Sequence, residues 1–203
     1  MSVIRSVVAA IAVVSASATL SSISSAQVNP PAPVAPAAAP PAAPPPPATI
    51  DIGRPAPDFT LAWADSIGPR KAPVTLSSLK GKIVVLAFYP GDRTSGCTAE
   101  LTKFRDEYAK MFGANTVVIP ISVDSIASHA SWAQEMKFPF ALASDPQLSV
   151  AEQYGSHNPG RSFASRTVFV IGKDGRILWR NLRFGALNEG AYTELAAEVA
   201  KAQ

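Results

Sequence analysis

The residue with the clearest chemical potential is Cys97, the only cysteine among 203 residues. A polar loop over residues 91–96 precedes it, and a segment with apolar residues at helical spacing follows it: Leu101, Phe104, Tyr108 and Met111. Cys97 is therefore predicted to lie in the first turn of a helix, where free N–H groups and the helix dipole favour the thiolate. A single cysteine is more often buried and inert, and only this loop-to-helix setting favours the reactive interpretation.

Composition excludes most other chemistries. One cysteine excludes an internal disulfide and a cysteine-rich zinc site, and no carboxylates stand at metal-ligand spacing from His129 or His157. The sequence has no Gly-x-Gly loop for a phosphate, so we expect neither a cofactor nor a metal. The net charge is +3, and basic residues form no stripe interleaved with aromatic residues. We therefore expect no nucleic-acid partner.

Hydrophobic patterning predicts alternating strands and helices. Residues 83–89 form a continuous apolar run, which is typical of a strand buried on both faces. A second strand is expected over 116–123, interrupted or bulged at Pro120, which cannot donate a ladder hydrogen bond. The helix that holds Cys97 in its first turn is expected to end near Gly113, and further helices are expected over 128–137, 147–154 and 188–201. Strands 168–171 and 177–180 flank an Asp-Gly turn. This order predicts an α/β fold with a mixed sheet.

The first 49 residues differ from the rest. Residues 1–26 resemble a signal peptide in pattern, with one arginine, an apolar stretch and the small residues Ser24-Ser25-Ala26. We expect cleavage after Ala26 and an exported, periplasmic or otherwise extracytoplasmic protein; an uncleaved anchor is the alternative. Residues 27–49 hold ten of the 19 prolines and predict an extended linker. A stiff spacer with weak surface association is favoured over a docking ligand, and the folded domain is expected over 50–203.

At the loop before Cys97 the sequence resembles a known family. The spacing Pro90-x-x-x-Thr94-x-x-Cys97 is similar to the active-site motif of the peroxiredoxins. Longer blocks resemble the bacterioferritin-comigratory, or PrxQ-like, subgroup: Gly96-Cys97-Thr98-x-Glu100, Ser122-Val123-Asp124-Ser125, Ser144-Asp145-Pro146 and Arg166-Thr167-Val168-Phe169. The resemblance spans most of residues 50–201. It implies a thioredoxin-like fold, with helices flanking a central mixed sheet, and thiol-dependent peroxidase activity of the AhpC/TSA type.

The resemblance also implies a role for each matching residue. Cys97 would be the peroxidatic cysteine, which attacks the peroxide and becomes a sulfenic acid. Thr94 would hydrogen-bond the peroxide, and Arg166 would hold the thiolate and the developing charge. Pro90 would shield the thiolate from water, and Glu100 would orient Arg166. Taken alone, Thr94 is an ordinary turn residue, Pro90 an ordinary strand end and Arg166 a surface charge; their joint spacing favours the functional interpretation.

One feature departs from the subgroup. Many of its members carry a resolving cysteine five positions after the first, where this chain has Thr102. The sulfenic acid would therefore be cleared by an external thiol, by a thioredoxin-like reductant, or by a second copy through a Cys97–Cys97 bridge in a homodimer. The substrate would be hydrogen peroxide, an organic hydroperoxide or both. The alternative function is an extracytoplasmic redox sensor or binding protein; a thiol–disulfide oxidoreductase is disfavoured because Thr94 stands where Cys-x-x-Cys needs a cysteine.

Overall fold

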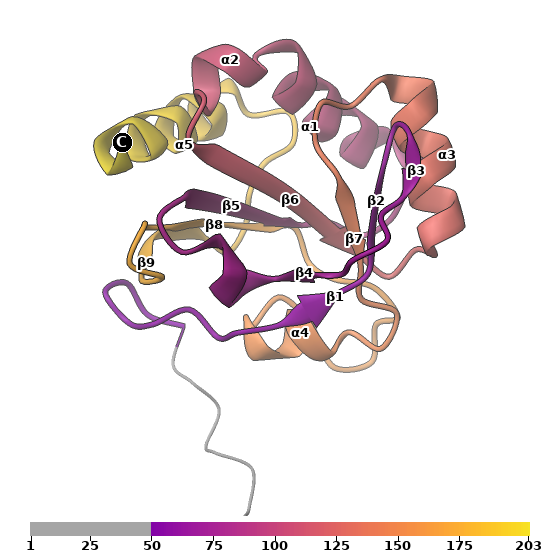
Figure 1. Cartoon of the computed structure of the whole chain (residues 1–203), viewed down its shortest axis with the longest axis horizontal. Coiled ribbons are helices and arrows are strands. Elements are labelled where there is room, and N and C mark those ends of the chain that lie inside the picture. The colour runs from indigo at the N-terminus through magenta and orange to yellow at the C-terminus, as the bar shows by residue number, and fades with distance from the viewer. Residues whose placement is uncertain (1–49) are drawn as a thin grey trace, which may run out of the picture. The chain divides into compact units, whose positions relative to one another are not determined.

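The computed structural model describes residues 50–203, so the predictions for 1–26 and 27–49 lie outside the described residues. Seven strands form one mixed sheet in the order β3-β2-β7-β6-β5-β8-β9, and β1 pairs with β4 separately (Figure 1). The strands are β1 Thr60–Leu61, β2 Trp63–Asp65, β3 Gly68–Pro69, β4 Val74–Thr75, β5 Ile83–Phe88, β6 Thr116–Ser122, β7 Leu142–Ser144, β8 Thr167–Ile171 and β9 Ile177–Asn181. The helices are η1 Leu76–Leu79, α1 Ser95–Asp106, α2 Tyr108–Met111, α3 Ile126–Met136, α4 Ser149–Gln153 and α5 Glu189–Ala202.

Strand β5 lies near the centre of the sheet and separates two cores. It pairs in parallel with β6 and antiparallel with β8, and all six of its residues are buried. Successive side chains point to opposite faces, so Val85 and Ala87 enter a core with α1, α2, α3 and α5, while Val84 and Leu86 enter a core with α4 and the β1–β4 pair (Figure 1). The apolar run 83–89 thus forms a strand buried on both faces, as predicted.

The prediction of an interruption at Pro120 was wrong. Pro120 pairs with Ala87 in a regular parallel register that runs from Ile83↔Thr116 to Phe88↔Ile121. The carbonyl of Ile121 accepts from Tyr89 on the β5 side, whereas that of Ser122 accepts from Asp145 on the β7 side. Pro120 therefore turns its nitrogen toward β7, with which the ladder begins only at Ile121. No donor is needed there, so the proline is tolerated without a bulge.

The helices and the hairpin largely follow the predictions. The segment after Cys97 forms α1 and then a separate turn, α2, because the chain leaves helical geometry at Glu107, with φ −107° and ψ 18°. Ser125 caps α3 through its hydroxyl oxygen, which accepts from the N–H of Ser128. Strands β8 and β9 form the predicted antiparallel hairpin, and α5 closes the fold. The short strands β1 to β4 and β7 were not predicted.

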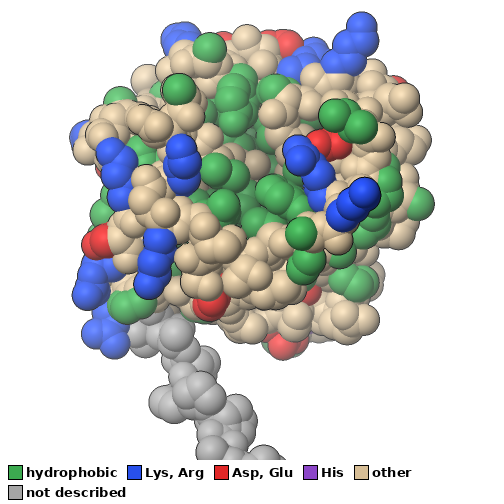
Figure 2. All heavy atoms as spheres, in the orientation of Figure 1, with side chains coloured by type: hydrophobic (Ala, Val, Ile, Leu, Met, Phe, Trp, Pro, Cys, Tyr) green, Lys and Arg blue, Asp and Glu red, His purple; other side chains and the backbone are tan. Residues whose placement is uncertain are grey.

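The surface carries scattered charge. On the side seen in Figure 2, hydrophobic side chains gather toward the middle, and Lys and Arg side chains lie around them without forming one stripe. Within residues 50–203, no helix combines the length and the apolarity that a bilayer span requires.

Candidate active site

Cys97 lies in the first turn of α1, where the loop from β5 turns into the helix. It is the third residue of α1, and Thr94 is the N-cap. The carbonyl of Thr94 accepts from the N–H of Thr98 at 2.8 Å and so closes the first turn. The Cys97 side chain is fully buried in the same core as Tyr89 and Leu101. The thiol is thus at a helix N-terminus as predicted, in a site from which bulk water is excluded.

Arg166 reaches the thiol from the start of β8. Because β5 and β8 pair with Phe88 opposite Thr167, Arg166 lies beside the end of β5, where the loop toward Cys97 begins. Its Nη2 is 3.3 Å from Cys97 Sγ, and its Nη1 forms an ion pair with Glu100 Oε2. The arginine side chain is 17% exposed. Three other arginines from the same part of the chain are exposed instead: Arg161, Arg176 and Arg183.

Glu100 is the carboxylate that positions this arginine. It lies one turn after Cys97, its side chain is fully buried, and its Oε1 has no hydrogen-bond partner. Burial raises the pKa of Glu100 from 4.5 to about 7, although the charge and hydrogen bond of Arg166 act in the opposite direction. A carboxyl group with such a pKa gains or loses its proton near neutral pH. The strength of the Glu100–Arg166 ion pair therefore depends on pH in the neutral range.

Thr94 and Pro90 line the loop around the thiol. Thr94 is exposed, and its hydroxyl donates to the carbonyl of Gly91 at 3.2 Å across the turn. Pro90 is half-buried and directly follows Tyr89, whose side chain is buried. The structure thus joins Cys97 and Glu100 through Arg166, and it places Thr94 and Pro90 on the loop that leads to them.

Gly96 leaves space for the arginine. A Cβ at this position would lie 3.1 Å from Arg166 Nη2, closer than most real contacts of a Cβ atom. The backbone of α1 thus approaches the guanidinium where only a glycine fits without displacement. Gly96 was part of the motif that carries the family resemblance, but its contact with Arg166 is visible only in the structure.

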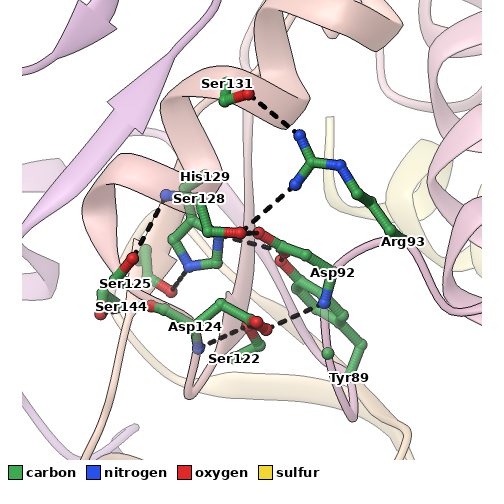
Figure 3. Close-up of polar contacts among 12 residues, drawn as sticks. Tyr89, Asp92, Arg93, Ser122, Asp124, Ser125, Ser128, His129, Ser131 and Ser144 are labelled. Atoms are coloured by element: carbon green, nitrogen blue, oxygen red, sulfur yellow. Dashed lines mark hydrogen bonds and ion pairs between the residues drawn. The ribbon is translucent and has the colours of Figure 1, made fainter.

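Sequence reasoning missed Asp92 and His129. Asp92 lies in the loop, His129 lies in α3, and His129 Nδ1 is 3.0 Å from Asp92 Oδ2 (Figure 3). The same carboxylate accepts from the Tyr89 hydroxyl and from the Ser128 hydroxyl, both at 2.7 Å. Asp92 and His129 are 37 positions apart. No local pattern in the sequence distinguishes either of them from an ordinary loop or helix residue.

A separate pocket lies at the other end of β5. Its volume is about 410 Å³, and its lining combines apolar and charged residues, among them Leu76, Lys80, Val84 and Arg176. None of the residues described around Cys97 contributes to it. This pocket is therefore separate from the site around Cys97.

Comparison with known proteins identifies the family. Residues 52–180 match the AhpC/TSA family. Peroxiredoxin Bcp of Bacillus subtilis is 36% identical over 143 residues, which cover 66% of this chain and 88% of that protein. The chloroplastic peroxiredoxin Q of Sedum lineare is 40% identical over 131 residues, which cover 63% of this chain and 67% of that protein.

Solved structures agree with these relatives. The crystal structure of peroxidoxin BcpB from Mycobacterium tuberculosis covers 76% of this chain and 99% of its own, with a TM-score of 0.64 and 30% identity. The crystal structure of Enterococcus faecalis AhpC covers 74% of this chain and 90% of its own, with a TM-score of 0.65 at 24% identity, and shares the fold. The predicted thioredoxin-like fold is confirmed. This chain belongs to the AhpC/TSA family, within the Bcp and PrxQ group of peroxiredoxins, and is a thiol-dependent peroxidase by family.

Proposed function

We propose that Cys97 alone carries the peroxidase reaction, with hydrogen peroxide or a small organic hydroperoxide as the substrate. The observation that supports this most strongly is the 3.3 Å approach of Arg166 Nη2 to Cys97 Sγ, with the arginine held by buried Glu100. A positive donor at this distance stabilises the thiolate. The same donor can stabilise negative charge that develops on a peroxide oxygen beside the sulfur.

The chemical step is a two-electron oxidation of sulfur. The Cys97 thiolate attacks the terminal oxygen of the peroxide, so that an S–O bond forms and the O–O bond breaks. Cys97 becomes a sulfenic acid, and the leaving oxygen takes a proton and departs as water or an alcohol. We assign Thr94 as a hydrogen-bond partner of the peroxide, because its hydroxyl donates to the Gly91 carbonyl and can still accept from a peroxide O–H. We assign Pro90 as the residue that keeps water from the thiolate.

Reduction then requires a thiol from outside the chain. One external thiol condenses with the sulfenic acid, releases water and leaves a mixed disulfide; a second thiol frees Cys97. Since Cys97 is fully buried, a reductant larger than a peroxide reaches it only after the loop or the first turn of α1 opens. The same route would serve a thioredoxin-like protein or a second copy that forms a Cys97–Cys97 bridge.

Burial of Cys97 and the lack of a second cysteine also favour one other function. A protein whose oxidised thiol is hard to reach stays oxidised after one event, which suits a redox sensor. The two functions separate when peroxide loss is followed with excess dithiothreitol. The peroxidase consumes many equivalents per chain, and this activity disappears in Cys97→Ser. A sensor stops after one equivalent, and that result would overturn the peroxidase proposal.

We also propose that the protein works outside the cytoplasm, on the strength of the signal-like pattern of residues 1–26. Cell fractionation and the intact mass of the recovered protein test this proposal. A periplasmic or secreted product that begins near Gln27 supports it, and a full-length product in the cytoplasm contradicts it.

Sedimentation of the reduced and oxidised protein tests whether two copies form a homodimer through a Cys97–Cys97 bridge.

A further inference from the structure

His129 has hydrogen-bond acceptors at both ring nitrogens. Nδ1 faces the carboxylate of Asp92, 3.1 Å from Oδ1 and 3.0 Å from Oδ2. Nε2 faces the carbonyl oxygen of Ala143 at 3.2 Å. A neutral imidazole has one donor and one acceptor nitrogen, so either tautomer would set a lone pair against an acceptor. Only the doubly protonated ring satisfies both contacts.

The two partners form a buried contact, which is an ion pair when the imidazole is protonated. The side chain of His129 is 0% exposed and that of Asp92 is 3% exposed. The pKa of Asp92 is lowered: burial opposes its charge, but hydrogen bonds from His129, Ser128 and Tyr89 and the charge of His129 outweigh burial. Loss of one member of such a pair leaves an uncompensated charge inside the protein.

The other charged groups near His129 belong to the loop, to α3 and to the turn after β6. Asp124 Oδ2 accepts from the Asp92 N–H at 2.9 Å and from the Ser122 hydroxyl at 2.7 Å (Figure 3). Arg93 Nη2 is 3.2 Å from Glu135 Oε2, so this arginine is already paired on α3. Asp92 is thus the carboxylate that contacts the ring, whereas Asp124 contacts the Asp92 N–H and Arg93 is paired with Glu135.

The loop needs such an anchor. Arg93, between Asp92 and Thr94, has φ 59°, in the left-handed region that is unfavourable for a residue with a side chain. Its side chain is held by α3 through Ser131 Oγ at 3.0 Å and through Glu135. Together with the Asp92–His129 contact, these contacts hold two successive residues of the loop, Asp92 and Arg93, against α3. Thr94 follows as the N-cap of α1, and Cys97 lies three residues after Thr94.

We propose that His129 is held as an imidazolium and that its ion pair with Asp92 clamps the loop 90–94 onto α3. In this position the loop keeps Thr94 and Cys97 in the arrangement that peroxide attack requires. His129 and Asp92 are positioning residues, since neither touches Cys97. The inference rests on the proposed peroxidase function, but its first consequence is physical: the clamp holds the loop closed over a buried thiol.

Two reactions of Cys97 respond in opposite directions if the clamp exists. Oxidation by hydrogen peroxide needs the closed loop, whereas alkylation by iodoacetamide, a bulkier reagent, needs it open. We expect His129→Leu to slow oxidation by about 10- to 100-fold, as for a misplaced reacting group. Alkylation should become several-fold faster. His129→Asn, whose amide can still donate toward Asp92, should recover much of the wild-type behaviour in both reactions.

The control is Tyr154→Phe, which removes a hydrogen bond to the carbonyl of Pro57 in the core on the other face of the sheet. Rate constants are measured by quenching and mass spectrometry well below the unfolding temperature, so that they report folded molecules. If His129→Leu acted only through a general loss of stability, its ratio of the alkylation rate to the oxidation rate would stay near that of Tyr154→Phe. That outcome, or unchanged rates in His129→Leu, overturns the clamp.

If the unpaired carboxylate of His129→Leu prevents folding, Asp92→Asn combined with His129→Leu carries the same test. The protonation state is tested separately by ring ¹⁵N shifts at neutral pH, assigned with His157→Gln because the chain has two histidines. Two protonated nitrogens support the proposal, and one bare nitrogen overturns it. If the wild type itself reacts slowly with peroxide, the proposed function fails, while alkylation and NMR still decide whether the clamp exists.

Discussion

Nη2 of Arg166 lies 3.3 Å from Sγ of Cys97, although the two residues are 69 positions apart in the chain. The same guanidinium is paired with Glu100, so the thiol, the arginine and the carboxylate form one chain of contacts. The carboxylate is fully buried and has no other partner in the described part of the chain. Changes to any of the three should therefore affect the reactivity of the sulfur.

Replacement of Arg166 should slow the oxidation of Cys97. A well-placed donor contributes about 3 kcal/mol to a transition state, so Arg166→Ala should reduce the rate constant with hydrogen peroxide by roughly 100-fold. Arg166→Lys keeps the charge but cannot contact Sγ and Glu100 as a fork, so it should recover only part of the rate. Stopped-flow oxidation measures both variants, with Arg183→Ala as the exposed control. Equal rates in Arg166→Ala and the control would contradict this role.

Gly96→Ala should separate activity from stability. Alanine is favoured over glycine in a helix by about 1 kcal/mol, so the midpoint temperature of thermal unfolding should stay the same or rise slightly. Its Cβ, however, would stand 3.1 Å from Arg166 Nη2 and displace the guanidinium from the sulfur. We expect oxidation of Cys97 to slow about tenfold, for a displacement of a fraction of an ångström. Ser95→Ala, at the exposed first position of α1, is the control; a fast, stable Gly96→Ala would show that the arginine moves without consequence.

Glu100 should make stability depend on pH in an unusual direction. Its pKa is raised from 4.5 to about 7 by burial, so between these values the folded state binds more protons than the unfolded state. The contribution of Glu100 to the free energy of unfolding is therefore largest below pH 4.5 and falls as pH rises to 7, by roughly 3 kcal/mol. Glu100→Gln removes this fall.

Urea unfolding of wild type and Glu100→Gln at pH 4.5 and 7.5 measures the effect. The variant should gain stability relative to wild type at the higher pH, whereas Glu189→Gln, which is exposed, should show no such change. A difference between Glu100→Gln and wild type that stays constant with pH would mean that folding does not raise the pKa of Glu100.

Excess peroxide should carry Cys97 beyond the sulfenic acid. Cys97 is the only cysteine, so no internal thiol competes for the oxidised sulfur. We expect intact mass spectrometry to show sulfinic acid accumulating with peroxide concentration, and a small external thiol to suppress it. A disulfide-linked dimer as the main product, without sulfinic acid, would show instead that a second copy reaches the buried sulfur faster than peroxide does.

Several features were predictable because neighbouring residues encode them. The continuous apolar run 83–89 predicted a strand with both faces buried, which β5 is. The polar loop, followed by apolar residues at helical spacing, predicted the start of α1. Pro120 was misjudged for the opposite reason. Whether a proline disturbs a strand depends on the neighbour that its nitrogen faces, and the ladder to β7 starts only after it.

From the sequence alone, Cys97 could be predicted at a helix N-terminus, and the motif around it indicated the peroxiredoxin family. The groups that surround the thiol became visible only in the folded protein. The register of β5 with β8 brings Arg166 to Cys97, and the packing of α3 against the loop brings His129 to Asp92. Periodicity and turn chemistry act over a few residues and can be read locally. Encounters between distant side chains depend on strand order, register and burial, which the whole core sets at once.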